Sequence, residues 1–167
     1  MSNTEPTIRT RTITWEDPLP SAHQGRAMSG IDYLRAIQSG EIPPPPIAVL
    51  LGMGIAEVEE GRAVFTALPA EYHYNPIGVV HGGLAATLLD SALGCAVHST
   101  LPAGTGYTTL EIKVNYVRAI TSETGEVRCE AKVIYQGGRI ATAEGRITDA
   151  QGKLYAHGTT TCIIFRP

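Results

Sequence analysis

The sequence has little cysteine, few aromatic residues and no long apolar run. Its 167 residues include three cysteines, two phenylalanines and one tryptophan. Cys95, Cys129 and Cys162 are odd in number and far apart in the chain, which favours reduced thiols over a disulfide framework. We therefore expect all three to fill the core of a cytoplasmic protein.

The signals of several other function classes are also absent. The net charge is −3 and no run of basic residues occurs, so nucleic acid is not expected as a partner. No stretch reaches about 18 apolar residues, which a membrane-spanning helix needs, and the first residues lack the pattern of a signal peptide. The sequence has neither a GxGxxG motif after a strand nor a Walker lysine, and its histidines and cysteines show no metal-ligand spacing. We expect no cofactor, no metal site and no contact with a membrane.

The length and composition predict one domain preceded by an arm. Residues 1–28 carry scattered charge, threonine and proline with little periodicity, so we expect a flexible N-terminal arm. The domain spans residues 29–167. Apolar residues at helical spacing over 31–37 predict a short helix that ends near Gly40. The run Pro43–Pro46 then predicts a stiff connector.

Six segments have the pattern of antiparallel strands. MGIAEVE and RAVFTAL flank a Glu-Gly turn and predict a hairpin. The other four are TTLEIKVNYVR, EVRCEAKVIY, RIATAEGRITD and KLYAHGTTTCIIF, and their period-2 alternation indicates one covered face and one wetter face. In the first of these four we expect Leu110, Ile112 and Val114 to share one face.

An apolar segment over residues 84–97 lies between the hairpin and these four strands. A helix that is apolar nearly all round is a buried helix. This segment is the only element long and apolar enough to cover the apolar face of the strands. We therefore predict an α+β fold, in which a long curved antiparallel β-sheet wraps around one central helix.

The segment NPIGVVHGGLAATLLDSALGCAVH, residues 75–98, holds the residues that indicate chemistry. Asp90 is a carboxylate within the apolar helix, and its burial is costly unless it is paired or used. Gly82 and Gly83 stand where the helix begins, and N–H groups there have no intrahelical partner. Glycine lets a ligand approach the backbone, and the helix dipole favours negative charge. A donor pocket beside a carboxylate is the arrangement that hydrolysis of an acyl bond requires.

Five small or polar residues form one stripe on this helix. They are Thr87, Asp90, Ser91, Gly94 and His98. Such a stripe must meet something other than the core, and either a subunit interface lined by an active site or a plain polar helix contact would fit. Taken alone, Asp90 could be a structural carboxylate, the glycine pair could serve a tight turn, and His98 could be a structural or surface group.

The chain resembles the hotdog-fold acyl-CoA thioesterases of the phenylacetate-pathway type. The resemblance rests on HGG followed seven residues later by Asp90, and on Asn75 six residues before the histidine. The strand TLEIKVNYVRA and the ending GRIATAEGRITDAQGKLYAHGTTT also match, so the resemblance covers roughly residues 30–165. It implies the hotdog fold, an acyl-CoA substrate and thioester hydrolysis.

The resemblance also implies roles for the motif residues. The N–H of Gly82 would bind the thioester oxygen with help from the helix dipole, and Gly83 would contact the substrate. Asp90 of a second subunit would act as general base on water or as nucleophile. Asn75 would position the water or the thioester oxygen. His81 belongs to the same motif, and we expect it to shape the loop through a hydrogen bond rather than to titrate.

Three further side chains are candidates for substrate contacts. In the family, a hydroxyl on the strand after the helix can help to hold the water. Thr109 is the best match for it, with the adjacent Thr108 as the alternative. The phosphates of coenzyme A need cations, and Arg118 at a strand end and Arg139 after a Gly-Gly turn are the candidates. A solvated arginine is the alternative for both.

Other functions and the oligomeric state remain open at this point. The same fold can serve as a non-catalytic acyl-CoA binding or sensing module, and His81 with Asp90 also allows a hydratase or dehydratase. One sheet covered by one helix leaves a sheet edge and a helix stripe without partners, which predicts a homodimer. The resemblance adds a homotetramer made of two dimers, with active sites at the subunit interface.

Overall fold

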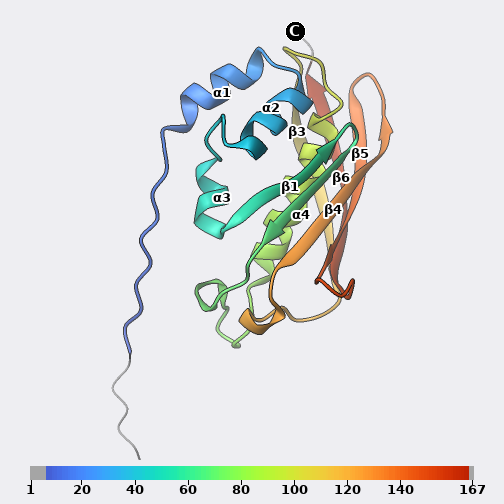
Figure 1. Cartoon of the computed structure of the whole chain (residues 1–167). Coiled ribbons are helices and arrows are strands. Elements are labelled where there is room, and N and C mark those ends of the chain that lie inside the picture. The colour runs from blue at the N-terminus through green and yellow to red at the C-terminus, as the bar shows by residue number, and fades with distance from the viewer. Residues whose placement is uncertain (1–6, 166–167) are drawn as a thin grey trace, which may run out of the picture.

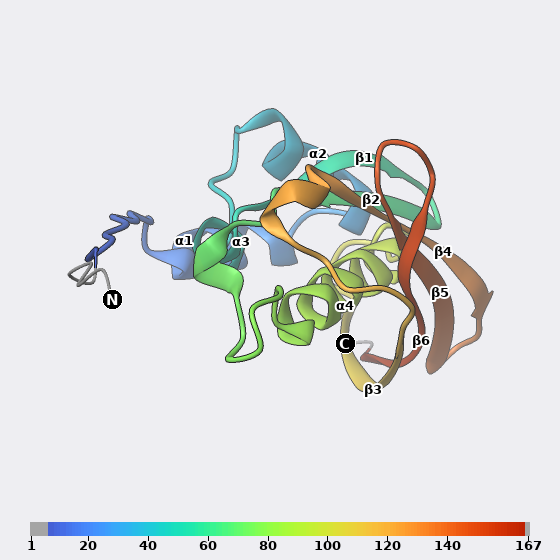
Figure 2. The same ribbon diagram turned by 90° about the horizontal axis from the view of Figure 1, so that it is seen from below.

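Helix α4, Gly82–His98, lies at the centre of the fold, and a six-stranded antiparallel sheet curls around it (Figures 1 and 2). The computed structural model describes residues 7–165. The strand order is β1-β2-β4-β5-β6-β3. The strands are β1 Met53–Glu59, β2 Arg62–Ala67, β3 Gly106–Tyr116, β4 Val127–Gln136, β5 Ile140–Thr148 and β6 Leu154–Phe165, and the two 3-10 turns are η1 Glu71–His73 and η2 Ser122–Thr124. The predicted α+β architecture, with a curved sheet around one central helix, is confirmed.

The core lies between α4 and the concave face of the sheet. The largest side chains that α4 buries completely are Leu88, Leu89, Leu93 and Val97. They belong to one cluster with small buried strand residues, among them Ala63, Ala131, Ala141, Ala143, Ala156, Cys129 and Cys162. Small side chains on the strands let the helix lie close to the sheet, as dense packing of an interior requires.

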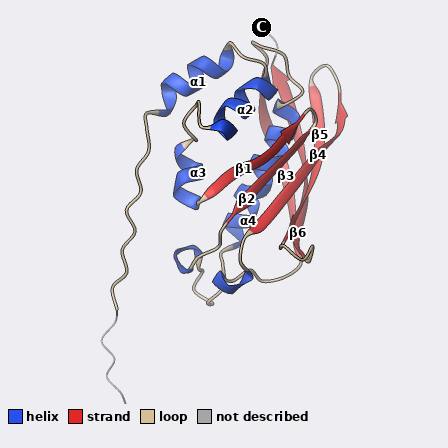
Figure 3. Ribbon diagram, in the orientation of Figure 1, coloured by secondary structure: helices blue, strands red, loops and turns tan. Residues whose placement is uncertain are grey.

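Three further helices gather beside the β1 edge of the sheet (Figure 3). They are α1 Pro18–Arg26, α2 Gly30–Ser39 and α3 Pro46–Leu51. The helix expected over 31–37 is confirmed as α2, which Ser29 caps and which ends at Gly40 in the left-handed conformation. Gln38 Nε2 donates to the carbonyl oxygen of Ala56 in β1 at 2.7 Å, so α2 covers this edge.

Two elements of the N-terminal part depart from the sequence pattern. The connector expected over Pro43–Pro46 is shorter, because Pro46 begins α3, where a helix tolerates the missing N–H. Residues 18–26 of the predicted arm form α1, whose first turn is capped by the side chain of Asp17. Ahead of α1, Arg11 donates to two carbonyl oxygens of α3 at 2.8 and 3.2 Å.

A β-bulge interrupts the alternation of β3. Thr109 and Glu111 lie opposite consecutive residues of β6, so Leu110 is the extra residue. The prediction that Leu110 shares the face of Ile112 and Val114 is therefore wrong, and its side chain is 57% exposed. The bulge shifts the phase of the strand by one residue. As a result, Thr109 reaches α4 instead of facing away with Glu111.

Candidate active site

The loop before α4 is held by Asn75. Its Oδ1 accepts the backbone N–H of Ile77 at 3.0 Å and that of Val79 at 3.3 Å. Its own N–H donates to the carbonyl oxygen of Val79 at 2.8 Å. Asn75 thus shapes the turn that leads into α4, and its side-chain NH2 group is the part left to reach a ligand.

At the start of α4, one of the two glycine N–H groups is bonded within the loop and the other is free. His81 is the N-cap, and its Nδ1 accepts the N–H of Gly83 at 2.8 Å. This bond occupies the N–H of Gly83, so the expected contact of Gly83 with the substrate cannot use this donor. Within residues 7–165 the Gly82 N–H makes no hydrogen bond to a protein acceptor. Gly82 therefore keeps the donor that a ligand oxygen could use.

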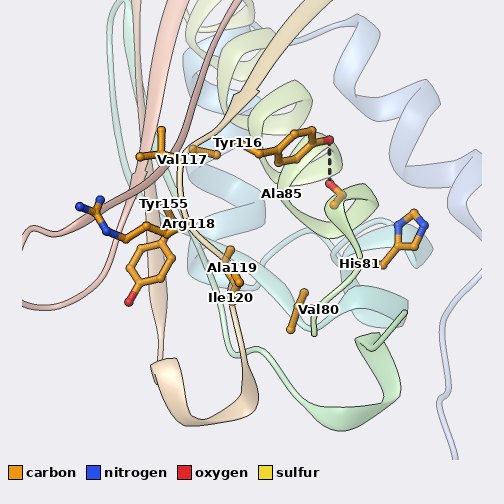
Figure 4. Close-up of a pocket in the computed structure, with 11 residues that line it drawn as sticks. Val80, His81, Ala85, Tyr116, Val117, Arg118, Ala119, Ile120 and Tyr155 are labelled. Carbon is orange, nitrogen blue, oxygen red and sulfur yellow. Dashed lines mark hydrogen bonds between the residues drawn. The ribbon is translucent and has the colours of Figure 1, made fainter. Parts of the chain in front are cut away.

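A pocket of about 320 Å³ lies next to Gly82 (Figure 4). We call it the Gly82 pocket; it is lined by Val80–Gly82 and Ala85 and, across from them, by Tyr116–Ile120, Tyr155 and Ala156. The Tyr116 hydroxyl donates to the carbonyl oxygen of Gly82 at 3.2 Å. A Cβ atom at Gly82 would lie 3.0 Å from the Tyr116 ring. The close approach of this ring explains why glycine occupies the first position of the helix.

Of the five residues of the polar stripe on α4, Asp90 alone is exposed. The expectation of a buried carboxylate is therefore wrong for the single chain. Asp90 Oδ1 accepts a hydrogen bond from Thr109 Oγ1 at 2.9 Å. The neighbouring Thr108 is exposed, because successive residues of a strand point to opposite faces, and the bulge at Leu110 sets which of the two threonines faces the helix. The contact with the helix is thus made by Thr109.

A second cavity, of about 630 Å³, begins at Asp90 and extends between α4 and α2. We call it the α2–α4 cavity. Its apolar lining consists of Leu34, Ile37, Pro44, Pro45, Ile47, Ala48, Met53, Ile55 and Phe65, and its polar lining includes Tyr33, Gln38, Ser91, Cys95, His98 and Tyr107. Sequence reasoning missed this cavity, because the residues come from six elements that only the fold brings together. The apolar residues of α2 and the proline run were the available signal.

The two parts of the predicted site do not meet within one chain. Gly82 and Asp90 are eight residues apart on α4, which is about 12 Å along the helix axis. They also line different cavities: Gly82 lines the Gly82 pocket, and Asp90 lines the α2–α4 cavity. A hydrogen-bond donor and a general base must both lie about 3 Å from a reacting group. One chain therefore cannot apply Gly82 and Asp90 to the same carbonyl.

Arg118 and Arg139 lie at opposite ends of the sheet. Arg118 follows β3 and donates to the carbonyl oxygen of Leu154, where β6 begins, at 2.6 Å. Arg139 precedes β5, and its carbonyl oxygen accepts the N–H of Ile164, near the end of β6, at 2.8 Å. Ten residues of extended strand between these contacts span about 33 Å. Of the two, only Arg118 lines the Gly82 pocket.

Burial raises the pKa of all three cysteine thiols. Burial raises the pKa of the Cys129 thiol to about 12, and burial together with the Asp90 carboxylate raises that of Cys95 to about 12. A thiol with such a pKa stays protonated and is a poor nucleophile. Cys129 and Cys162 are buried as expected of core residues, whereas Cys95 is half-buried and lines the α2–α4 cavity.

Across residues 7–165, no three His, Cys, Asp or Glu side chains are grouped as metal ligands would be. No helix in this range has the length and apolarity to cross a membrane.

Comparison with known proteins shows the family. The family model described as the thioesterase superfamily matches residues 77–156. Human acyl-coenzyme A thioesterase 13 is 30% identical over 115 residues, which is 68% of this chain and 80% of that protein. A Halobacterium salinarum protein named as an esterase is 39% identical over 102 residues, covering 56% of this chain and 64% of its own length.

A solved structure agrees with these sequence matches. A phenylacetic acid degradation-related protein from Ralstonia eutropha superposes with a TM-score of 0.71 at 28% identity, over 78% of this chain and 98% of that chain. The chain therefore belongs to the hotdog-fold acyl-CoA thioesterases of the thioesterase superfamily.

Proposed function

We propose that this protein hydrolyses an acyl-CoA thioester at a site formed by two copies of the chain. The observation that carries the proposal is the hydrogen bond from Thr109 to Asp90 where the α2–α4 cavity opens. It orients a carboxylate toward the space in which an acyl group would lie. Since Gly82 of the same chain is about 12 Å away, a second copy must supply the donor for the thioester oxygen.

Pairing of two β3 edges would bring the two halves of the site together. The β1 edge is covered by α2, whereas β3 is the open edge and carries the exposed Leu110. In an antiparallel pair about a two-fold axis, the beginning of one β3 lies beside the end of the other. Thr109 is near the beginning of β3, and Tyr116, which bonds Gly82, is its last residue. This pairing would set Asp90 of one copy opposite Gly82 of its partner.

In such a site the two copies would have different tasks. The Gly82 N–H would donate to the thioester oxygen, where negative charge develops, and the α4 dipole would add to this stabilisation. Thr109 holds Oδ1 of Asp90, so Oδ2 would take a proton from water as the water oxygen bonds to the thioester carbon. The C–S bond then breaks, and the coenzyme A thiolate takes up a proton and leaves a free acid.

Direct attack by Asp90 on the thioester is the competing mechanism. It would form an anhydride between Asp90 and the acyl group before water enters. A single turnover in oxygen-18 water distinguishes general-base catalysis from direct attack in which water then enters at the aspartyl carbonyl of the anhydride. General-base catalysis puts the label into the product acid, whereas direct attack followed by hydrolysis at the aspartyl carbonyl puts it into Asp90.

The remaining motif residues fit supporting roles. We propose that Arg118 binds a phosphate of coenzyme A, since it lines the pocket beside Gly82. Arg139 would act on a different part of the substrate or from another copy, because it lies about 33 Å from Arg118 along β6. Asn75 would offer its NH2 group to the water or the thioester oxygen, while His81 and Gly83 fix the helix start. We further propose a homodimer that assembles into a homotetramer.

The first experiment measures thiol release from a panel of acyl-CoAs by the wild type and Asp90→Asn. The substitution keeps the shape of the side chain and removes the base. We expect turnover to fall by about 10²–10⁴-fold with an unchanged circular dichroism spectrum. Undiminished turnover in the variant would contradict the mechanism. No hydrolysis by the wild type, with acyl-CoA still bound, would favour the binding module instead.

The donor role of Gly82 has a matched pair of variants. Gly82→Pro removes the N–H at the first helical position, where proline is tolerated, whereas Gly82→Ala keeps it. Both variants place a Cβ atom near the Tyr116 ring, so the steric change is shared. We expect kcat of the proline variant to be about 10²-fold below that of the alanine variant. Equal kcat values would remove Gly82 from the mechanism.

A further inference from the structure

The α2–α4 cavity has a polar end that lies away from Asp90. His98 is eight residues after Asp90 on α4, about 12 Å along the helix axis. The ring of Tyr107 leans on His98 with 5.3 Å between the ring centroids, and the ring of Tyr33 meets it edge-on at 5.9 Å. We call these three residues the end wall. They come from β3, α2 and α4, so the fold brings them together.

The hydrogen-bonding groups of the end wall are unused in the single chain. Among the described residues, neither tyrosine hydroxyl and neither nitrogen of His98 takes part in a hydrogen bond to a protein group. Tyr107 rests on Gly94, where a Cβ atom would lie 2.8 Å from its hydroxyl. Glycine at this point of α4 thus makes room for a polar group inside the cavity. Partly buried polar groups without a partner call for a ligand or water.

The end wall is uncharged at neutral pH. Burial lowers the pKa of His98 and raises that of Tyr33 and of Tyr107, so the imidazole is neutral and both phenols keep their protons. Among residues 7–165, the charged side chain that faces the cavity is Asp90, at its other end, and no lysine or arginine of this range lines it. A carboxylate at this end would lack a cation, whereas a hydroxyl could both donate and accept.

Because the rest of the lining is mainly apolar, the polar end wall is the part of the cavity that can distinguish one acyl group from another. Apart from Gln38, Ser91, Cys95 and Thr109, the lining between Asp90 and the end wall consists of aliphatic side chains, prolines and Phe65. An apolar wall accepts any chain of the right size, but it does not distinguish a hydroxyl from a methyl group strongly. A site that hydrogen-bonds a hydroxyl discriminates better, because its own polar groups stay unpaired with the wrong ligand.

We infer that Tyr33, His98 and Tyr107 select acyl groups that carry an uncharged hydroxyl at the far end from the thioester. This inference rests on the proposed function for the identity of the ligand, and it adds the residues that determine specificity. The 12 Å between Asp90 and His98, less a contact distance at each end, leaves about 6 Å for the acyl group. A chain of about five or six carbons, or one phenyl ring, spans that length.

The test uses three thioethers of coenzyme A that cannot be hydrolysed. Their S-substituents are hexyl, 6-hydroxyhexyl and 5-carboxypentyl, and binding is measured by titration calorimetry. We expect the hydroxyl compound to bind wild-type protein about 3- to 10-fold more tightly than the hexyl compound, and the carboxylate most weakly. Tyr33→Phe and Tyr107→Phe remove one hydroxyl each, and at least one of them should reduce this preference to less than about twofold.

Two comparisons keep the result interpretable. Tyr135→Phe removes a hydroxyl from a tyrosine on β4 that is 61% exposed and lies outside the cavity lining, so it should keep the wild-type preference. Equal affinity of the wild type for the hexyl and hydroxyhexyl compounds would overturn the inference, as would a preference that survives both cavity variants. Hydrolysis of hexanoyl-CoA, measured in parallel, tests the proposed function separately, because binding of the thioethers does not require turnover.

Discussion

Replacing Thr109 by valine tests whether the bond to Asp90 serves catalysis. Valine keeps the branched shape and suits a strand, so β3 should form as before. The change removes the hydroxyl that donates to Asp90 Oδ1 at 2.9 Å. A hydrogen bond to a charged group contributes about 1.5–3 kcal/mol, which corresponds to roughly 10- to 100-fold in rate. We expect kcat for a good acyl-CoA substrate to fall by that factor, with KM little changed.

Two neighbouring variants serve as controls in the same thiol-release assay. Thr109→Ser keeps the hydroxyl and should stay within about threefold of the wild type, since only a methyl group is lost. Thr108→Val makes the same chemical change one residue earlier, on an exposed side chain. It should leave kcat unchanged. If Thr109→Val were fully active, or if both valine variants lost activity equally, the hydrogen bond would have no part in positioning Asp90.

Three further outcomes are expected. Leu88→Ala, at a fully buried position, should lower the free energy of unfolding by about 2–5 kcal/mol in urea titrations. The backbone N–H of Lys153 lowers the pKa of the Asp149 carboxyl, so this carboxylate stabilises the fold above about pH 4 and loses that effect as the pH falls through its folded-state pKa. Asp149→Asn should therefore lower the melting temperature at pH 7 more than at pH 3. His81→Asn, which keeps an acceptor for the Gly83 N–H, should retain more activity than His81→Ala if the histidine acts as a cap.

The elements with long, regular patterns were predictable from the sequence. The central helix was expected over 84–97 and spans Gly82–His98, and the strands lie where alternating residues indicated them. The prediction from alternating residues fails at Leu110. Period-2 alternation assumes an unbroken ladder, and a single bulged residue exchanges the two faces for everything before it. The same bulge turns Thr109 toward the helix, so the error in the strand and the contact at Asp90 have one cause.

The residues of the candidate site were predictable from the sequence, but their arrangement in space and the cavity beside them were not. The motif around Gly82 and Asp90 is recognised by the spacing of residues close together in the chain, which can be read from the sequence. The α2–α4 cavity and the end wall instead depend on contacts between α2, α4 and β3, which are far apart in the chain. The exposure of Asp90 has a similar origin. A carboxylate among apolar residues looks buried in the sequence, yet Asp90 is exposed in the single chain while its neighbours Leu88 and Leu89 are buried.

The most direct measurement of the shared site is complementation between two inactive variants. Asp90→Asn and Gly82→Pro are produced separately and co-expressed in equal amounts, and acyl-CoA hydrolysis is measured on the purified mixture. In a mixed dimer with two-fold symmetry one site holds both substitutions and the other holds neither. With half of the dimers mixed, we expect about a quarter of the wild-type activity from two variants that are each inactive alone. A mixture as inactive as its parents, although mixed dimers are present, would contradict a site built from Gly82 of one copy and Asp90 of the other.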